Sequence, residues 1–208
     1  MKKLKKEKNK NKSRLLIIGS LFFVIGISII SFNFITSYNL HNEEEKAIKE
    51  YYIQEEQQEN NENTSKTSEN ISQTKNDYIG IIKIPKINLV RGLVSPSSKY
   101  NYVDYNIQII EGSDMPNVVN GCFILAAHSG TARISYFKHL NKLSIGDNVS
   151  IDYANKTYKY QIVNIYEVEK TGKVTIKRDY DKSTLALITC KHNTNKQIVV
   201  VANLMEVN

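Results

Sequence analysis

An uncharged run of 21 residues, residues 15–35, restricts the folding of this chain more than any other feature. As an α-helix it would be about 32 Å long, which matches the roughly 30 Å hydrocarbon core of a bilayer. The alternative is the apolar region of a cleaved signal peptide, which is shorter and ends at a small-x-small site. The sequence Ile-Thr-Ser-Tyr at residues 35–38 is a poor cleavage site. We therefore expect an uncleaved transmembrane anchor over residues 15–36.

The net charge of +7 is concentrated before this run. Residues 1–14 contain eight Lys or Arg and one Glu, while the remaining chain has 20 charges of each sign. A basic flank before a transmembrane helix predicts a cytoplasmic N-terminus and an external C-terminal part. The composition thus indicates a cytoplasmic basic tail at residues 1–14 and a membrane as partner. It argues against a nucleic-acid partner, which would need a basic stripe on the folded part.

A polar linker is expected over residues 37–76. Residues 41–76 contain nine Glu and four Lys, with many Gln, Asn, Ser and Thr. Residues 43–58 could form a short polar helix, but we identify no stable apolar stripe there. We therefore predict disorder or a semi-rigid stalk that lifts the following domain off the lipid.

From residue 77 to residue 208 the composition is that of a globular domain. Short runs rich in β-branched residues alternate with turn residues, and Pro85 indicates a sheet edge or strand end. Apolar residues recur every three positions from Ile134 to Leu143, which predicts a short helix. Many strands and few helices favour a closed, mainly β barrel with one or two short helices. The predicted strands are residues 78–84, 107–110, 122–128, 149–151, 157–168, 184–190 and 196–204.

The chain has two cysteines, Cys122 and Cys190. Two cysteines do not make a disulfide framework, so the fold must depend on its own core. A bridge between them is possible, but Cys122 lies inside a strand-like run and is interpreted as a core residue. Cys190 ends an apolar strand, where the sheet fixes the residue while its sulfur can face a groove. That position suits a nucleophile, and an inert buried thiol is the alternative interpretation.

A nucleophilic cysteine needs a base elsewhere in the fold, and His128 is the candidate. It ends an apolar strand and is surrounded by small residues. The remaining histidines are interpreted as surface residues, except His192, which follows Cys190 by two positions and would line the site. No Cys/His cluster has metal-ligand spacing, so we expect no metal site.

Together these features resemble the sortase family. The resemblance is carried by Leu187-x-Thr189-Cys190 near the C-terminus, an apolar strand ending in His128, and a membrane-anchored basic N-terminus. Two further stretches, Ile-Pro-Lys-Ile at residues 84–87 and Leu-Ser-Ile-Gly-Asp at residues 143–147, are similar to that family. The similarity covers about residues 78–207 and implies a closed sortase-type β-barrel in a Gram-positive-type envelope.

The resemblance implies a cysteine transpeptidase that acts on sorting signals of secreted surface proteins, often Leu-Pro-x-Thr-Gly. The Cys190 thiolate would attack the backbone carbonyl of the peptide bond just after the Thr side chain, which is the carbonyl of the Thr itself. The His128 cation would protonate the leaving amine. An amine of peptidoglycan or lipid II would then resolve the thioester. Some sortases bind calcium, but nothing in this sequence specifies it, so we expect no cofactor. The residues expected to contact substrate are Leu187, Thr189, Ala127, Ser129, His192 and Arg133.

One position departs from the family pattern. Sortases supply an Arg at the start of the last strand as a donor to the oxyanion. Here the register of residues 196–202 puts Gln197 at that position, while Lys196 points to the opposite face. Gln197 can donate a hydrogen bond but carries no charge, and Arg133 could enter the site instead. Two other functions therefore stay open: a membrane-anchored cysteine protease, and a poorly active sortase-fold binding protein.

Overall fold

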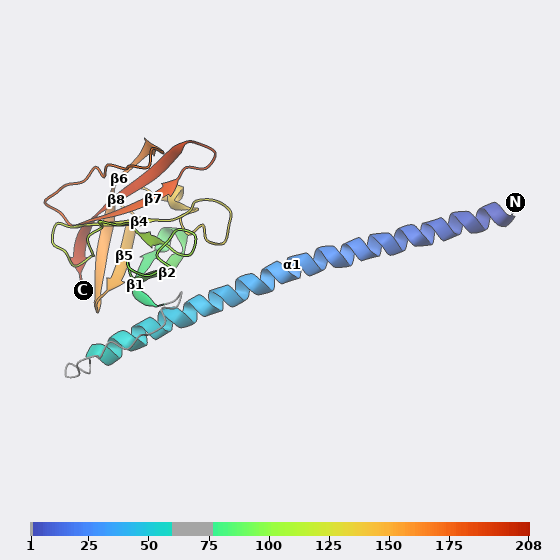
Figure 1. The fold of residues 1–208 in the computed structure, drawn as a ribbon, viewed down its shortest axis with the longest axis horizontal. Helices are drawn as coiled ribbons and strands as arrows, with labels where there is room; N and C mark the ends of the chain where they lie inside the picture. Colours follow the sequence, from blue (N-terminus) through green and yellow to red (C-terminus); the bar gives the residue numbers. More distant parts are fainter. Residues whose placement is uncertain (1, 60–76) are drawn as a thin grey trace. The chain divides into compact units, whose positions relative to one another are not determined.

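The computed structural model describes residues 2–59 and 77–208. All seven predicted strands are present, together with an additional strand, β2, and two short 3-10 helices (Figure 1). The helices are α1 (Lys2–Glu59), η1 (Pro85–Ile87) and η2 (Leu140–Lys142). The strands are β1 (Tyr78–Ile84), β2 (Leu89–Val94), β3 (Gln108–Ile109), β4 (Cys122–Ala126), β5 (Asn148–Tyr153), β6 (Lys156–Glu169), β7 (Thr184–Cys190) and β8 (Lys196–Val207).

The strands form one eight-stranded sheet in the order β2-β1-β5-β6-β8-β7-β4-β3. Every neighbouring pair is antiparallel except β4 and β7, which are parallel. The two end strands, β2 and β3, contact each other, so the sheet curls into a nearly closed barrel. At this seam Arg91 Nε donates a 3.0 Å hydrogen bond to Asn106 Oδ1. The predicted mainly β barrel is confirmed. Its two end strands, β2 and β3, contact each other at the seam without pairing as neighbouring strands.

Side chains of β4, β7 and β8 alternate between the barrel interior and the outer face of the sheet. Pairs such as Leu125 and Leu187 point inward and belong to the main core, which η2 helps to cover through Leu140. The intervening residues face outward, where the connection between β6 and β7 covers them with Val174 and Ile176. These outward residues are Ile124 and Ala126 of β4, Ile188 of β7, and Val199 and Val201 of β8.

The end of α1 differs from the predicted linker. Ala47, Ile48, Tyr51 and Tyr52 follow helical spacing and form the apolar stripe that the sequence analysis missed. Ala47 and Tyr51 are buried against Tyr78, Ile81 and Val94 of the barrel. This segment therefore belongs to the folded domain, in a compact unit that comprises residues 46–208. Residues 60–76 of the predicted linker lie outside the described residues.

The part of α1 before residue 46 forms a unit of its own. It contains the segment Ile18–Thr36, which has a mean hydropathy of 2.2 and is long and apolar enough to cross a membrane. This segment coincides with the predicted anchor at residues 15–36. Helical structure is present where the anchor was expected, and its length and composition are compatible with insertion into a bilayer.

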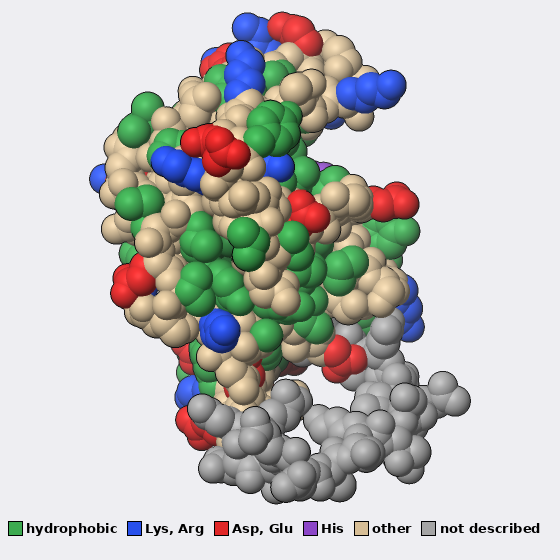
Figure 2. Space-filling view, turned by 90° about the vertical axis from the view of Figure 1, so that its left-hand side faces the viewer, with side chains coloured by type: hydrophobic (Ala, Val, Ile, Leu, Met, Phe, Trp, Pro, Cys, Tyr) green, Lys and Arg blue, Asp and Glu red, His purple; other side chains and the backbone are tan. Residues whose placement is uncertain are grey.

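Charged side chains are mixed in sign on the domain surface. Figure 2 shows one face, on which hydrophobic side chains gather near the centre and Lys or Arg side chains alternate with Asp or Glu. Opposite charges of the domain also pair directly, as in the 3.0 Å contact between Lys159 Nζ and Glu206 Oε2. The mixed surface agrees with the balanced charge of the chain after residue 14.

Candidate active site

The parallel pairing of β4 and β7 brings His128 and Cys190 together. Ala126 is the register partner of Ile188, and Ala127 N donates a 3.2 Å hydrogen bond to Ile188 O, which continues the ladder by one step. One residue further along each chain, the same register sets His128 beside Cys190. Because side chains alternate, both share the outer face with Ala126 and Ile188. The strands are about 4.8 Å apart, so the two side chains are neighbours on that face.

Gln197 joins this pair from β8. It is the antiparallel register partner of Cys190, and directly opposed residues present their side chains on the same face. Its Oε1 is buried and has no hydrogen-bond partner within residues 77–208. Lys196 points to the other face, where its Nζ is 3.9 Å from Glu167 Oε2. A thiol, an imidazole and a carboxamide with an unused polar atom therefore meet at one end of three strands.

The His128 ring contacts a carboxylate that sequence reasoning missed. His128 Nε2 is 3.1 Å from Asp104 Oδ1, and the two side chains are 40% and 76% exposed. Asp104 lies in the connection between β2 and β3, where no strand or helix periodicity indicates which way a side chain points. Within residues 77–208 no hydrogen bond joins the Cys190 thiol to the His128 ring. Hydrogen bonds of this kind often form only when substrate is bound.

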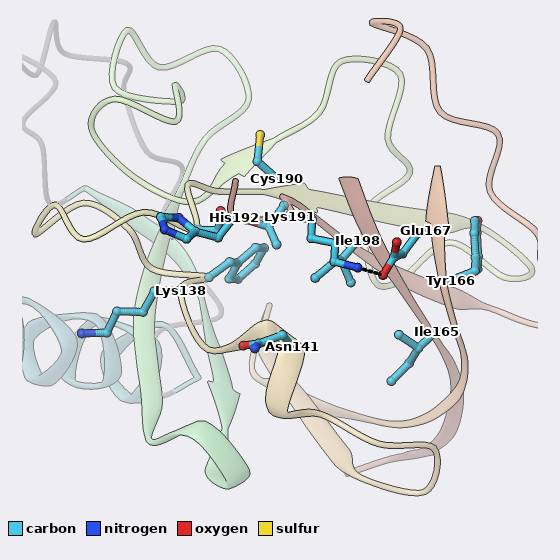
Figure 3. Close-up of a pocket in the computed structure, with 12 residues that line it drawn as sticks. Lys138, Asn141, Ile165, Tyr166, Glu167, Cys190, Lys191, His192 and Ile198 are labelled. Carbon is cyan, nitrogen blue, oxygen red and sulfur yellow. Dashed lines mark hydrogen bonds and ion pairs between the residues drawn. The ribbon is translucent and has the colours of Figure 1, made fainter. Parts of the chain in front are cut away.

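A cavity of about 510 Å³ lies beside the end of β7. Figure 3 shows the Cys190 sulfur directed away from the Asn141 and Ile165 side chains of this cavity. Cys190 thus lines the cavity while its sulfur points away from these two side chains. The lining residues are Ser129, Phe137, Lys138, Asn141, Ile165, Tyr166, Glu167, Thr189, Cys190, Lys191, His192 and Ile198.

Comparison with known proteins identifies the fold family. The Sortase domain model matches residues 82–205, more than half of the chain and the whole of the site above. The chain belongs to the sortase family. A search of the curated proteins found no match.

Solved structures of several sortases are similar to this one. The sortase D5 transpeptidase of Clostridium perfringens is 26% identical, with a TM-score of 0.54 over 63% of this chain and 81% of that one. Sortase C1 of Streptococcus agalactiae is 27% identical, with a TM-score of 0.52 over 62% of this chain and 68% of that one. Sortase A of Corynebacterium diphtheriae shares the fold at 22% identity, with a TM-score of 0.56 over 63% of this chain and 62% of that one.

Three residues expected to contact substrate in this sortase face the barrel interior. Leu187 is fully buried in the core, and Ala127 is 5% exposed. Thr189 is also buried, and its Oγ1 donates a 2.7 Å hydrogen bond to Ala127 O, which ties β7 to the end of β4. Strand alternation puts all three side chains on the face opposite Cys190. Leu187 and Ala127 therefore pack in the core, while Thr189 also lines the cavity. Contact of these three residues with substrate stays a prediction.

The other expected contacts have different surroundings. Ser129 and His192 line the cavity, and Arg133 is an exposed residue of the loop after His128. The loop between β7 and β8 is held at its base by a 2.5 Å ion pair between Lys191 Nζ and Glu167 Oε1. The hydrogen bond from Lys191 lowers the pKa of Glu167.

The second cysteine is remote from the site. Cys122 is the register partner of Thr184 at the start of β7, six positions before Cys190. Six residues of strand span about 20 Å, far beyond the reach of a disulfide, and both cysteines are free. Burial raises the pKa of the Cys122 thiol, which disfavours its reactive thiolate.

Acidic and histidine side chains do not cluster in the part of the chain that the structure describes. No group of three His, Cys, Asp or Glu residues there could hold a metal ion. Calcium usually requires six to eight oxygen ligands, several of them carboxylates. Asp114, in the loop before β4, instead accepts a 2.8 Å hydrogen bond from Cys122 N.

Proposed function

We propose that this sortase is a membrane-anchored cysteine transpeptidase that cleaves Leu-Pro-x-Thr-Gly-like sorting signals of secreted surface proteins and joins them to a cell-wall amine. The observation that carries the proposal is the β4–β7 register, which makes His128 and Cys190 neighbours on one face. The similar Clostridium perfringens protein is described as a transpeptidase, which supports the same class of reaction.

In the first half-reaction the Cys190 thiolate attacks the backbone carbonyl carbon of the Thr of the signal, in the peptide bond between the Thr and the Gly. A carbon–sulfur bond forms and the negative charge moves to the carbonyl oxygen, to which the Gln197 amide donates a hydrogen bond. The carbon–nitrogen bond then breaks, its electron pair goes to nitrogen, and the His128 imidazolium donates the proton. A thioester with Cys190 and a neutral His128 remain.

In the second half-reaction an amine of peptidoglycan or lipid II attacks the thioester carbonyl. The neutral His128 accepts the proton that the amine loses, and the Cys190 thiolate departs. If water attacked the thioester in place of the amine, the product would be a peptide with a free carboxylic acid. This hydrolysis is the reaction of a cysteine protease.

The proposed location is the cell membrane of a Gram-positive-type envelope. The basic composition of residues 1–14 and the apolar segment of α1 support a single-pass anchor with a cytoplasmic N-terminus. The folded domain would then face secreted surface proteins and the wall.

The test is product analysis with the full chain in lipid nanodiscs, a library of sorting-signal peptides, and an amine acceptor. We expect a ligated product from the wild type and none from Cys190→Ala. Cys122→Ala is the matched control and should form the product as the wild type does. Hydrolysis that never gives way to ligation would favour the protease. Peptide binding without any turnover would favour the binding protein.

A further inference from the structure

A carboxylate outside the proposed mechanism contacts its imidazole. His128 Nε2 and Asp104 Oδ1 are 3.1 Å apart, which is hydrogen-bond distance. Asp104 is 76% exposed, so burial does not force it toward the ring. An exposed side chain contributes to an active site only if its backbone is held in position.

Asn106 holds one side of the Asp104 turn. Asn106 is fully buried, two residues after Asp104. Its Oδ1 accepts a 3.0 Å hydrogen bond from Arg91 Nε of β2 and a 2.9 Å hydrogen bond from Ile107 N. The Arg91 guanidinium also stacks 4.4 Å from the Tyr136 ring centroid. The C-terminal side of the turn is thus fixed to the barrel seam.

Asn101 holds the other side. It is 6% exposed, three residues before Asp104. Its Nδ2 donates to Ile109 O at 2.9 Å, and its Oδ1 accepts from Ile109 N at 2.7 Å. Between the two asparagines, Tyr102 O accepts hydrogen bonds from Tyr105 N and Asn106 N, both 2.9 Å long. Asp104 therefore stands on a closed turn that is anchored on both sides.

We propose that Asp104 is the positioning residue of His128: its carboxylate holds the ring in the orientation that proton transfer to the leaving amine needs. This inference rests on the proposed function, in which the imidazolium is the proton donor. Activated nucleophiles generally have a base beside them, and a third group orients that base. On the neighbouring strands, Cys190 lies at the end of β7, and the uncharged Gln108 of β3 is the register partner of Ala126, two residues before His128.

An oriented ring acts on the chemical step and not on substrate binding. In the proposed mechanism His128 donates a proton to the leaving amine and accepts one from the incoming amine. Loss of the orienting carboxylate should therefore lower kcat and leave KM little changed.

The experiment compares the full chain in nanodiscs with Asp104→Asn, which keeps the shape and removes the charge. For peptide ligation, we expect kcat to fall about tenfold with KM little changed, as is typical when the group that orients a functional histidine is lost. Asp181→Asn is the matched control and should follow the wild type, because it removes an exposed carboxylate that precedes the start of β7, the end opposite Cys190. Asp104→Glu should restore part of the loss.

A second readout does not depend on turnover. The His128 ring should be more mobile in Asp104→Asn than in the wild type, as measured by NMR relaxation of its ring carbons. An unchanged kcat together with unchanged ring mobility would overturn the inference while leaving the proposed function intact. A loss that appears only in KM would also overturn it. If the wild type itself forms no product, the proposed function fails, and the ring mobility alone decides the Asp104–His128 pair.

Discussion

Gln197 is the residue that we propose stands where sortases supply an Arg, and its position makes this proposal testable. Cys190 is its register partner, and an amide oxygen of Gln197 is buried without a partner in the described domain. A carboxamide can rotate to present either its oxygen or its NH2 group. The side chain can therefore donate to an oxyanion on the outer face.

Gln197→Ala should reduce turnover by about 10²–10³-fold, because it removes one oxyanion donor. Gln197→Arg should keep or raise activity, since a forked cation can bind the same oxygen. Lys196→Ala is the matched control, because that side chain lies on the other face. Steady-state ligation rates measure all three. If Lys196 proves essential and Gln197 dispensable, the donor has been misassigned.

Single residues were predictable from sequence only where a strand fixed their direction. Cys190, His128 and Gln197 each lie at or next to a strand end, where the strand register determines the face on which a side chain lies. Leu187 and Thr189 belong to the same strand as Cys190, but strand alternation turns their side chains inward. Asp104 could not be found, because its direction depends on side-chain bonds between buried asparagines and the barrel.

At the scale of elements, the end of α1 is joined to the barrel through one buried carboxylate. Asp152 of β5 is 4% exposed. It accepts hydrogen bonds from the Tyr52 hydroxyl of α1 and from Thr157 Oγ1, and it forms a 2.6 Å ion pair with Lys83 of β1. This junction could not be predicted from the sequence, because Tyr52, Lys83 and Asp152 are 31 to 100 residues apart in the chain and Tyr52 lies in a segment with linker composition.

Tyr52→Phe should lower the free energy of unfolding of residues 46–208 by about 1–3 kcal/mol, since it removes a hydrogen bond to a charged group. Tyrosine fluorescence during urea unfolding measures it. Tyr102→Phe, at an exposed position outside the junction, is the control. Equal stability of Tyr52→Phe and wild type would mean that the helix end contributes no hydrogen bond to the fold in solution.

The same junction predicts how stability depends on pH. Burial alone would raise the pKa of Asp152, but hydrogen bonds from Lys83, Tyr52 and Thr157 together lower it. The contribution of Asp152 to the free energy of unfolding is therefore fully present above its unfolded pKa of about 3.9, and it is lost as pH falls through the folded pKa. For Lys83, burial opposes the charge, but bonds to Asp152 and Tyr52 raise the pKa. The contribution of Lys83 to the free energy of unfolding is fully present below its unfolded pKa of about 10.4, and it is lost as pH rises through the folded pKa.

Unfolding free energies between pH 2 and pH 6 should therefore rise with pH more steeply in the wild type than in Asp152→Asn. Asp181→Asn, which removes an exposed carboxylate, should retain the wild-type slope. An unchanged slope in Asp152→Asn would show that this carboxyl titrates alike in the folded and unfolded chain.

At the scale of the whole molecule, the proposed topology leaves residues 46–208 outside the cell. Residues 46–59 pack on the barrel, while residues 60–76 keep the polar composition of a linker. On intact cells, an external protease should therefore cut within residues 60–76 and yield a fragment of about 130 residues. Immunoblotting of both termini measures it. A protected C-terminus, or a mature chain that begins after Ser37, would contradict the topology.

The barrel itself was predictable, because seven of its strands are marked by periodicity and turn residues. Residues 89–94 were missed, since this edge strand carries Arg and Gly and lacks a continuous apolar run. The sequence could not indicate that β4 and β7 are parallel, yet this pairing creates the site.

The most direct test of the account is the covalent state of Cys190 during turnover. The full chain in nanodiscs is mixed with a sorting-signal peptide, quenched in acid and analysed by intact mass and peptide mapping. We predict a thioester on Cys190 that disappears when an amine acceptor is added, accumulates in Cys122→Ala as in the wild type, and forms about 10²–10⁴-fold more slowly in His128→Ala. Ligated product from Cys190→Ala, or an acyl group on another residue, would contradict the central claim.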